Sequence, residues 1–436
     1  MMKQQTHVTL PSVSNKRGFV SLSPLLLMVI LFFALSLWLG DFYQVPLVVL
    51  FLAASVYSIC LLRGEKLQDR IALFSKNAGD SSLLLMIWIF VLAGSFASAA
   101  KEMGAVDATV GLTLSLIPGN MLLAGMFMAS CLVSLSVGTS VGTIVALVPV
   151  ATGLAQHTGI SLPLMVASIV GGALFGDNLS FISDTTVVAT RTQGCRMKDK
   201  FRANFLIALP AAVMAIVIYV WLGSDVSHRP VDLDYEWQKV IPYLFVLLAA
   251  VWGMNVILVL TLGLALTGIV GIGCGAITLH KWLQSIASGI GGMSELIIIS
   301  MMAGGLLGIV RHLGGIQWVL QSLTRHVRTS RGAEYAMAML VSVTNLCTAN
   351  NTIAILSVGD LVRNIAQQLG VSPKKAASIL DTFSCCIQGV IPYGMQLLMA
   401  GGLASVPPAS IVPYLYYPFL LFFVAIVAIW FRLPKV

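Results

Sequence analysis

Residues 176–186 read Gly-Asp-Asn-Leu-Ser-Phe-Ile-Ser-Asp-Thr-Thr and lie inside an otherwise apolar stretch. They place two carboxylates, an amide and four hydroxyls within eleven residues. A carboxylate is costly inside a lipid bilayer, so it usually faces a binding site or a partner. We therefore predict an interrupted membrane helix in which Asp177 and Asp184 offer hard oxygen ligands to a small cation such as sodium.

Apolar runs continue on both sides of this stretch, from Leu25 to the C-terminus. Of the 436 residues, 58% are hydrophobic and 10% charged, whereas about 25% of a soluble domain is charged. Many runs reach the roughly 20 residues that a bilayer-spanning helix needs. We predict an all-α, polytopic membrane protein of about fourteen spans, including interrupted helices.

The basic residues lie in short clusters between the apolar runs. If the N-terminus is cytoplasmic, 21 of the 25 Lys and Arg residues, Lys200 among them, fall on the inner side. The positive-inside rule then predicts a multi-pass protein of the bacterial inner (plasma) membrane with both termini cytoplasmic. The lipid bilayer is the expected partner, and the scattered charge argues against nucleic acid. The seven cysteines lack metal-binding spacing, and we expect no cofactor.

The second half of the chain aligns with the first at a shift of 209 to 211 residues. Thr143–Leu147 then meets Thr352–Leu356, for example, and Gly159 meets Gly370. Residues 101–119 and 311–332, read as the loops after the first span of each repeat, differ in charge, which indicates opposite orientations. Inverted repeats with interrupted helices are typical of secondary transporters.

The predicted organisation has five parts. They are an N-terminal two-helix segment (1–80), repeat 1 (81–202), a three-helix linker (203–289), the inverted repeat 2 (290–405) and a C-terminal helix (406–436).

Two polar turns between consecutive spans form a second candidate site. Thr139 and Ser140 lie in the first turn, and Asn350 and Asn351 lie in its repeat mate. The inverted pair could supply backbone carbonyls to a cation at mid-membrane. Alternatively, the glycines around the first turn serve only close helix packing.

Three further intramembrane positions carry polar groups. Asp381 opens a polar stretch in which Gln388 matches Asp177 of the other repeat, so a carboxylate faces a neutral amide across the repeats. Glu295 is a candidate proton relay or gate, and an interface position is an equal alternative. For Asp177 and Asp184, the alternative interpretation is capping of broken helices or pairing with Arg191.

The candidate ion- or substrate-binding residues are therefore Asp177, Asn178, Ser180, Asp184, Thr185, Thr186, Thr139, Ser140, Asn350, Asn351, Asp381 and Gln388, with Asp177 and Asp184 as the sodium ligands.

Residues 175–186 resemble the signature of the NhaC family of sodium/proton antiporters, and the second-half segments 350–352 and 381–394 also resemble that family. The family usually has lysine where this chain has Asn178, and Pro-Leu where it has Phe181-Ile182. The resemblance implies sodium and protons as coupling ions. Because related members exchange malate for lactate or move amino acids, it leaves a second substrate open.

We interpret the chain as a sodium/proton antiporter, not an enzyme. A carboxylic acid in a medium of low dielectric holds its proton more tightly, so a proton and a sodium ion compete for the same oxygens. The alternative is a sodium- or proton-coupled antiporter or symporter of an amino acid or carboxylate. An intramembrane aspartyl protease would need a Gly-x-Gly-Asp pattern and an ATP-driven pump a P-loop, and neither motif is present. Both a small organic solute as partner and a homodimer are compatible with the sequence.

Overall fold

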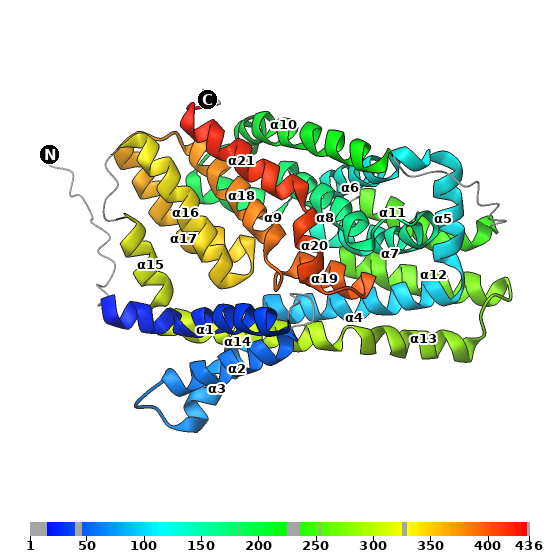
Figure 1. Ribbon diagram of the computed structural model, residues 1–436, viewed down its shortest axis with the longest axis horizontal. Helices are drawn as coiled ribbons and strands as arrows, with labels where there is room; N and C mark the ends of the chain where they lie inside the picture. The colour runs from blue at the N-terminus through cyan, green and yellow to red at the C-terminus, as the bar shows by residue number, and fades with distance from the viewer. Residues whose placement is uncertain are drawn as a thin grey trace.

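A backbone that crosses lipid must satisfy its hydrogen bonds within each segment, and this chain does so with helices. The computed structural model describes residues 15–39, 46–181, 183–224, 236–252, 254–324 and 329–433. Every regular element in these ranges is helical, which confirms the predicted all-α class. The helices α4, α10, α13 and α14 run along the longest axis of the molecule (Figure 1).

The first half of the chain forms ten α-helices in its described residues. They are α1 (Asn15–Leu39), α2 (Leu47–Leu61), α3 (Leu67–Ala78), α4 (Ser81–Glu102), α5 (Ala105–Leu116), α6 (Leu122–Val137), α7 (Ser140–Thr158), α8 (Leu162–Leu179), α9 (Asp184–Gln193) and α10 (Met197–Gly223).

The described residues of the second half form eleven more. They are α11 (Ile241–Val251), α12 (Val256–Gly273), α13 (Leu279–Gly292), α14 (Ser294–His312), α15 (Gly315–Thr324), α16 (Ser330–Thr348), α17 (Asn351–Leu369), α18 (Pro373–Val390), α19 (Met395–Ala404), α20 (Pro408–Ile411) and α21 (Tyr416–Trp430).

Eight stretches of the described chain are long and apolar enough to cross a membrane, or nine if the bent pair around Leu415 counts as one span. Four shorter apolar helices accompany them. These findings confirm a polytopic membrane protein, although fewer stretches qualify than the fourteen spans expected. α2 and α11 have only 15 and 11 residues. The 19-residue helices α16 and α17 are long enough but carry many polar side chains.

Two segments expected to be loops contain helices instead. α5 lies within residues 101–119, and α15 lies within residues 311–332. Each follows a glycine in the left-handed conformation, with φ of 80° at Gly104 and 82° at Gly314. Glycine adopts this conformation without steric cost, so the chain turns sharply and starts a new helix at equivalent positions in the two halves.

The halves share their helix boundaries as well as their sequence landmarks. α7 and α17 begin at residues 140 and 351 after turns whose residues 138 and 349 have positive φ. α8 and α18 both break after their last turn, and the chain resumes in α9 and α19. The hairpins α6–α7 and α16–α17 lie toward opposite ends of the molecule (Figure 1). These features agree with inverted repeats built around interrupted helices.

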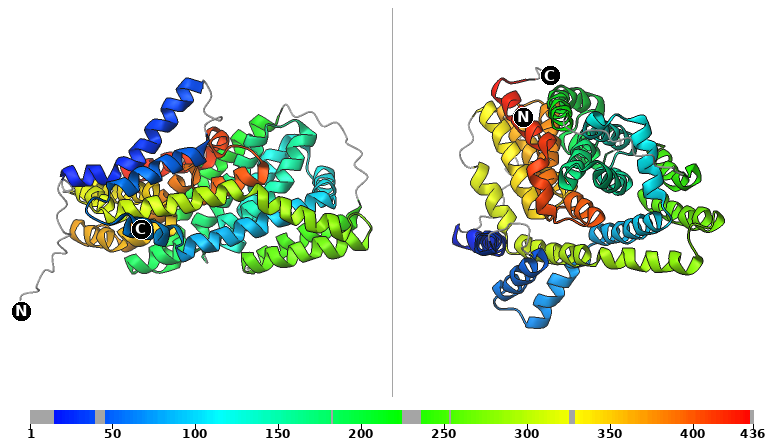
Figure 2. Two further views of the ribbon diagram at one scale, coloured as in Figure 1. Left: turned by 90° about the horizontal axis from the view of Figure 1, so that it is seen from below. Right: turned by 45° about the vertical axis from the view of Figure 1, so that its right-hand side comes forward.

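The helices of each half pack extensively against those of the other. α4 packs against α12 and α13, while α14 packs against α2 and α3. The short half-helices also pack against the opposite half of the chain. α9 packs on α17, and α19 packs on α7. The views in Figure 2 show the halves interleaved. The division at residues 81, 203, 290 and 406 stays a prediction.

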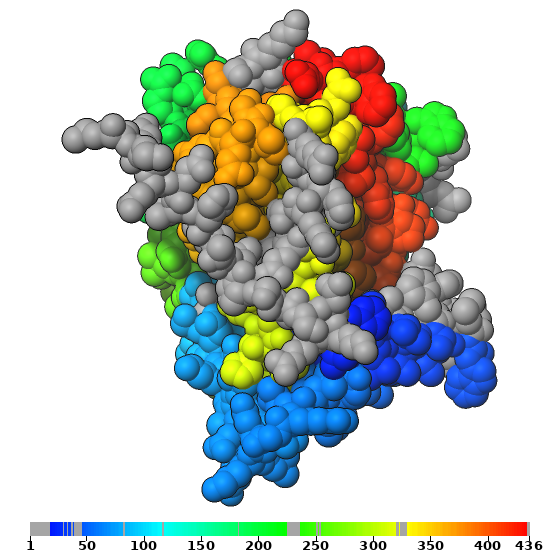
Figure 3. All heavy atoms as spheres, turned by 90° about the vertical axis from the view of Figure 1, so that its left-hand side faces the viewer, coloured from blue at the N-terminus to red at the C-terminus, as the bar shows by residue number. Residues whose placement is uncertain are grey.

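The start of α1 and the end of α21 lie at the same end of the molecule (Figure 1). Figure 3 looks onto that end, where the coloured atoms include those of α2 and α3 in light blue, of α16 to α18 in yellow and orange, and of α21 in red. The first turn of α10 also lies toward this end (Figure 1).

Candidate functional site

The break between α8 and α9 positions the central carboxylate. Asp177 lies in the last turn of α8, and Ser183, in an extended conformation, directly precedes α9. The Asp177 side chain is almost completely buried, at 5% exposure. Because the helix stops just beyond Asp177, its carboxylate can face polar groups that a continuous helix would hold further apart.

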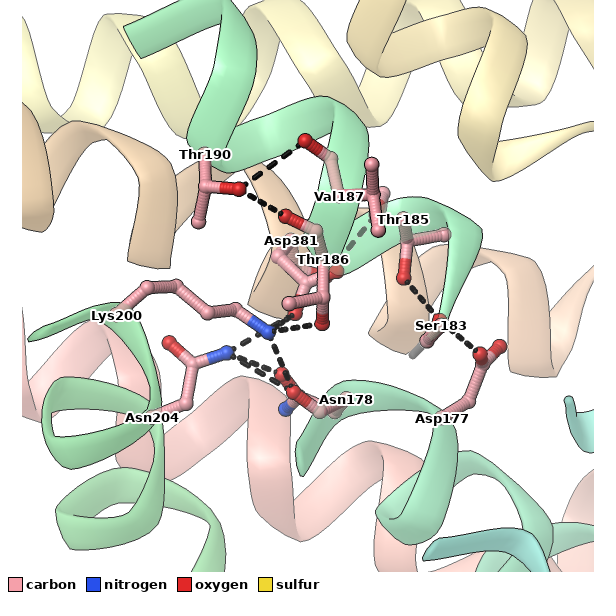
Figure 4. Close-up of polar contacts among 11 residues, drawn as sticks. Asp177, Asn178, Ser183, Thr185, Thr186, Val187, Thr190, Lys200, Asn204 and Asp381 are labelled. Carbon is pink, nitrogen blue, oxygen red and sulfur yellow. Dashed lines mark hydrogen bonds and ion pairs between the residues drawn. The ribbon is translucent and has the colours of Figure 1, made fainter. Parts of the chain in front are cut away.

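Two hydroxyl groups hydrogen-bond to this carboxylate. Ser140 Oγ, from the first residue of α7, donates to Asp177 Oδ2 at 3.0 Å. Ser183 Oγ donates to Asp177 Oδ1 at 2.6 Å and lies 2.9 Å from Thr185 Oγ1 (Figure 4). The carboxylate therefore receives hydrogen bonds from α7 and from the α8–α9 break, with hydroxyl oxygens gathered around it.

A hydrogen-bonded chain links Asp177 to its counterpart in the other half. Gln396 Nε2 donates to Ser140 Oγ at 3.0 Å, and Gln388 Nε2 donates to Gln396 Oε1 at 2.8 Å. Gln388 Nε2 also donates to the carbonyl oxygen of Ala349 at 3.1 Å. The two equivalent positions, 177 and 388, are thus joined through the α18–α19 break. We call Asp177, Ser140, Ser183, Gln396 and Gln388 the central network.

A buried ion pair lies beside the central network (Figure 4). Lys200 Nζ of α10 pairs with Asp381 Oδ2 of α18, and both side chains are shielded from solvent. The ammonium also donates to the Asn178 carbonyl oxygen and to Thr186 Oγ1, each at 2.6 Å. Asn204 Nδ2 donates to Asp381 Oδ2 at 3.0 Å and to Asn178 Oδ1. Lys200 therefore binds polar groups both at the end of α8 and in the middle of α18.

The carboxylates of Asp177 and Asp381 differ in whether a basic residue neutralises their negative charge. Asp381 has Lys200 as a direct counter-ion, whereas Asp177 forms no ion pair with any described residue. A buried charge without a partner is strongly disfavoured. Asp177 is therefore the carboxylate whose negative charge calls for a bound cation or a proton.

The structure brings together seven of the predicted residues. Five of them, Asp177, Ser140, Gln388, Asn178 and Asp381, belong to the central network or to the surroundings of Lys200. Thr185 contacts Ser183, and Thr186 contacts Lys200. Neighbours along the chain and partners from the other half thus meet in one buried region.

Other predicted residues lie outside this arrangement. Asp184 is the first residue of α9 and its side chain is exposed, so the structure does not place it with the Asp177 carboxylate. Glu295 is also exposed, in the first turn of α14. Ser180 donates to the Leu135 carbonyl oxygen at 3.1 Å.

The residues of the two polar turns, which were predicted to form a second site, do not come together in the structure. Thr139 is the N-cap residue of α7, and its carbonyl oxygen accepts a hydrogen bond from Thr143 Oγ1 at 3.1 Å. Asn350 caps α17 through Ile353 N at 3.0 Å, and Asn351 Oδ1 accepts from Thr352 N at 3.0 Å. Among these four residues, only Ser140 reaches Asp177.

Sequence reasoning misassigned Lys200 and overlooked Asn204. The charge pattern predicts that Lys200 lies on the inner membrane surface, but its side chain is 0% exposed and ion-paired. The signal was available in α10, where Lys200 and Asn204 are four residues apart and so share a helix face. That face continues with the buried alanines Ala208, Ala211 and Ala215, which mark it as the packed side.

The chain is similar to known sodium/proton antiporters. The profile of the Na+/H+ antiporter family matches residues 18–224 and 238–434. The Na+/H+ antiporter NhaC of Bacillus subtilis is 25% identical over 368 residues, covering 76% of this chain and 80% of that protein. NhaC of Alkalihalophilus pseudofirmus is 25% identical over 412 residues, covering 87% of each.

Among solved structures, the YdaH transporter of Alcanivorax borkumensis aligns with a TM-score of 0.42 at 14% identity, covering 89% of this chain and 97% of that one. The family profile spans nearly the whole chain in two stretches that are separated by residues 225–237. The chain therefore belongs to the Na+/H+ antiporter family, as the resemblance of residues 175–186 implied.

Proposed function

We propose that this protein exchanges sodium ions for protons across the membrane and that Asp177 carries both ions in turn. The observation that supports this most directly is a buried carboxylate, 5% exposed, that has hydroxyl partners but no basic partner. The NhaC antiporters that resemble the chain support the choice of sodium and protons.

Sodium ions prefer oxygen ligands, and the two Asp177 oxygens with the hydroxyls of Ser140 and Ser183 provide them. When sodium leaves, protonation neutralises the carboxylate, which otherwise would remain charged in a medium of low dielectric. Because one acid cannot hold both ions, binding of either displaces the other. Such competition at a single carboxylate is sufficient for exchange once the site opens alternately to the two sides.

The interrupted helices offer a way to open the site alternately. α9 packs on α17 and α19 packs on α7, so each half-helix moves with a hairpin of the opposite half. A shift of one hairpin would change the access of the α8–α9 break to one side. Relative motion of inverted repeats around a fixed site is the usual basis of alternating access.

The remaining assignments follow the same proposal. We place the protein in the bacterial plasma membrane with both termini cytoplasmic, because most Lys and Arg residues fall on that side in the predicted topology. Lys200 neutralises Asp381 and anchors Asn178 beside the ion site. Asp184, exposed at the start of α9, attracts cations toward the break rather than holding them.

The proposal is tested by reconstituting the protein in liposomes and following sodium-dependent proton efflux with a pH-sensitive dye. Asp177→Asn keeps the size of the side chain but cannot carry a negative charge. We expect at least about a tenfold loss of exchange, equivalent to 1.4 kcal/mol or more. The matched control is Asp360→Asn on α17, an exposed carboxylate that should exchange at the wild-type rate. Near-normal exchange by Asp177→Asn would remove the site assignment.

A further inference from the structure

The hydrogen bonds of the central network run in one direction, and a backbone carbonyl group sets that direction. Gln388 Nε2 lies 3.1 Å from the carbonyl oxygen of Ala349, which can only accept a hydrogen bond. The second hydrogen of this amide nitrogen reaches Gln396 Oε1 at 2.8 Å. The nitrogen of Gln396 therefore faces the other way and donates to Ser140 Oγ at 3.0 Å. Each amide thus directs a hydrogen toward Ser140 in the first repeat.

This direction fixes the hydrogen of the Ser140 hydroxyl group. A serine hydroxyl has a single hydrogen, and the Ser140 oxygen already accepts the hydrogen bond from Gln396. The Ser140 hydrogen points to Asp177 Oδ2, which is 3.0 Å from Ser140 Oγ. Ser140 and Gln396 are only 2% and 4% exposed, so bulk water has little access to either hydrogen bond. Ser140 is therefore held as a hydrogen-bond donor to the carboxylate.

The Ser183 hydroxyl group, which binds the other carboxylate oxygen, can reverse its hydrogen bond. Ser183 Oγ donates to Asp177 Oδ1 at 2.6 Å and lies 2.9 Å from Thr185 Oγ1 (Figure 4). Because its only hydrogen lies on Asp177, Thr185 is the donor in the second contact. A hydroxyl also accepts, so Ser183 can instead donate to Thr185 and accept from a protonated Asp177. Toward Gln396, Ser140 lacks this alternative, because an amide nitrogen cannot accept a hydrogen bond.

We infer that Gln396 sets the preference of the site for sodium over the proton by orienting the Ser140 hydroxyl group. It is a positioning residue, since its hydrogen bonds go to Ser140 and Gln388 rather than to the carboxylate. Hydrogen bonds donated to a carboxylate stabilise its charged form, which binds sodium, against its protonated form. This inference rests on the exchange proposed above and assigns the transported proton to Asp177 Oδ1, beside Ser183.

The two hydroxyl groups act in opposite ways on the competition between the ions. Ser140, oriented by Gln396, opposes a proton on Oδ2 of Asp177. Thr185 offers an acceptor for the Ser183 hydrogen and so permits a proton on Oδ1. Loss of the Gln396 amide should therefore strengthen proton binding, and loss of the Thr185 hydroxyl should weaken it. A side chain that only supports the fold predicts neither change.

Other titratable groups that face Asp177 do not supply a competing pH dependence. They are Lys200 of α10, Asp381 and Cys385 of α18 and Tyr417 of α21. Lys200 and Asp381 neutralise each other, and a thiol and a phenol carry no charge near neutral pH. Asp184 of α9 is exposed, and α6, α7 and α19 contain no Asp, Glu, Lys or Arg. The pH dependence of sodium binding should therefore follow the hydroxyl groups around Asp177.

The experiment measures the sodium concentration for half-maximal exchange in proteoliposomes at a series of pH values. Toward low pH this concentration rises, because protons occupy Asp177 and sodium must displace them. With Gln396→Leu we expect the rise to begin about one pH unit higher than in the wild type, which corresponds to about tenfold stronger competition by protons. The position of the rise is the decisive readout, since loss of a sodium ligand raises the concentration at every pH.

A second variant should shift the same profile in the opposite direction. Thr185→Val keeps the shape of the side chain but removes the acceptor for the Ser183 hydrogen, so the rise should begin at lower pH than in the wild type. Gln193→Leu is the matched control. Gln193 is 3% exposed, and its amide donates to the Gly359 carbonyl oxygen at 2.9 Å, outside the central network. Its rise should begin at the wild-type pH, whatever its rate of exchange.

The inference is wrong if Gln396→Leu raises the sodium concentration equally at every pH, or if Gln396→Leu and Thr185→Val shift the profile in the same direction. A shift with Gln193→Leu equal to that with Gln396→Leu overturns it as well. If Gln396→Leu is inactive at every pH, the direction of the Thr185→Val shift decides. In all these cases exchange by the wild type leaves the proposed function standing. Wild-type vesicles without sodium-dependent proton efflux would overturn that function, and this inference with it.

Discussion

The two helix breaks occupy equivalent places in the repeats but carry different chemistry. The α8–α9 break has a carboxylate at Asp177 and hydroxyls at Ser183 and Thr185. The α18–α19 break has amides at Gln388 and Gln396. Amides both donate and accept, so they bind each other, whereas a carboxylate with hydroxyls offers net negative charge. The repeat thus provides two similar scaffolds, and only the first is equipped to hold a cation.

The helices that follow the breaks show the same asymmetry. α10 places Lys200 and Asn204 against the end of α8. α21, which follows the second break, has no charged residue between Tyr416 and Trp430. The positive charge of Lys200 is neutralised by the negative charge of Asp381 from the other half. These two charges beside Asp177 therefore cancel. This arrangement leaves one exchangeable negative charge in the buried region.

The largest effect is expected from breaking the fixed pair. Lys200→Met leaves Asp381 buried without a counter-ion, and removing one partner of a buried pair costs about 3–5 kcal/mol of stability. Thermal unfolding in detergent measures the loss. Lys200→Met combined with Asp381→Leu should recover most of it, because neither charge then remains.

Lys239→Met is the control for this comparison, since its partner Glu236 is 60% exposed. Surface pairs contribute about 0–1 kcal/mol, so this variant should unfold near the wild-type temperature. If Lys200→Met is as stable as Lys239→Met, the pair does not compensate Asp381, and the contrast between the two carboxylates fails.

A smaller effect is expected from single substitutions in the two helix breaks, and their effects on sodium affinity should differ. Ser183→Ala removes a hydrogen bond to a charged group, worth about 1.5–3 kcal/mol, whereas Gln388→Ala removes bonds between neutral groups, worth about 0.5–1.5 kcal/mol each. We expect the sodium concentration for half-maximal exchange to rise about tenfold or more for Ser183→Ala. For Gln388→Ala we expect a rise of only a few-fold.

Ser357→Ala serves as the hydroxyl control, because Ser357 Oγ donates only to the Ile353 carbonyl oxygen on the exposed side of α17. Its half-maximal sodium concentration should be unchanged. Equal shifts for Ser183→Ala and Gln388→Ala would show that both breaks hold the ion.

Local patterns predicted much of this arrangement. The helical class, the repeat and the break near Asp177 follow from apolar runs, a constant offset and a polar insertion in a membrane helix. The match between Asp177 and Gln388 was visible in the alignment, and the structure adds the hydrogen bonds that join them. These features depend on residues close in sequence or on the internal symmetry.

Contacts between the halves were not predictable in the same way. Gln396 and Ser140 are 256 residues apart, and no local pattern pairs them. Lys200 follows a cluster of basic residues at a helix start, so composition alone assigns it to the membrane surface. Its burial depends on α18 supplying Asp381, a tertiary contact. α5 was missed because twelve residues are too few for a spanning run.

The smallest effect is expected at the other carboxylate of the 176–186 segment. Asp184 stands exposed at the N-terminus of α9, where a negative charge stabilises the helix dipole by about 0.3–1 kcal/mol. Asp184→Asn should therefore change sodium/proton exchange less than about twofold, with a slight loss of thermal stability. Exchange by Asp184→Asn and by Asp177→Asn, measured in parallel, compares a surface acid with a buried one in the same break. An exposed charge that only attracts cations acts through an electric field that salt screens, so its removal has a small effect. A loss as complete as that of Asp177→Asn would therefore mean that both acids hold the ion during transport.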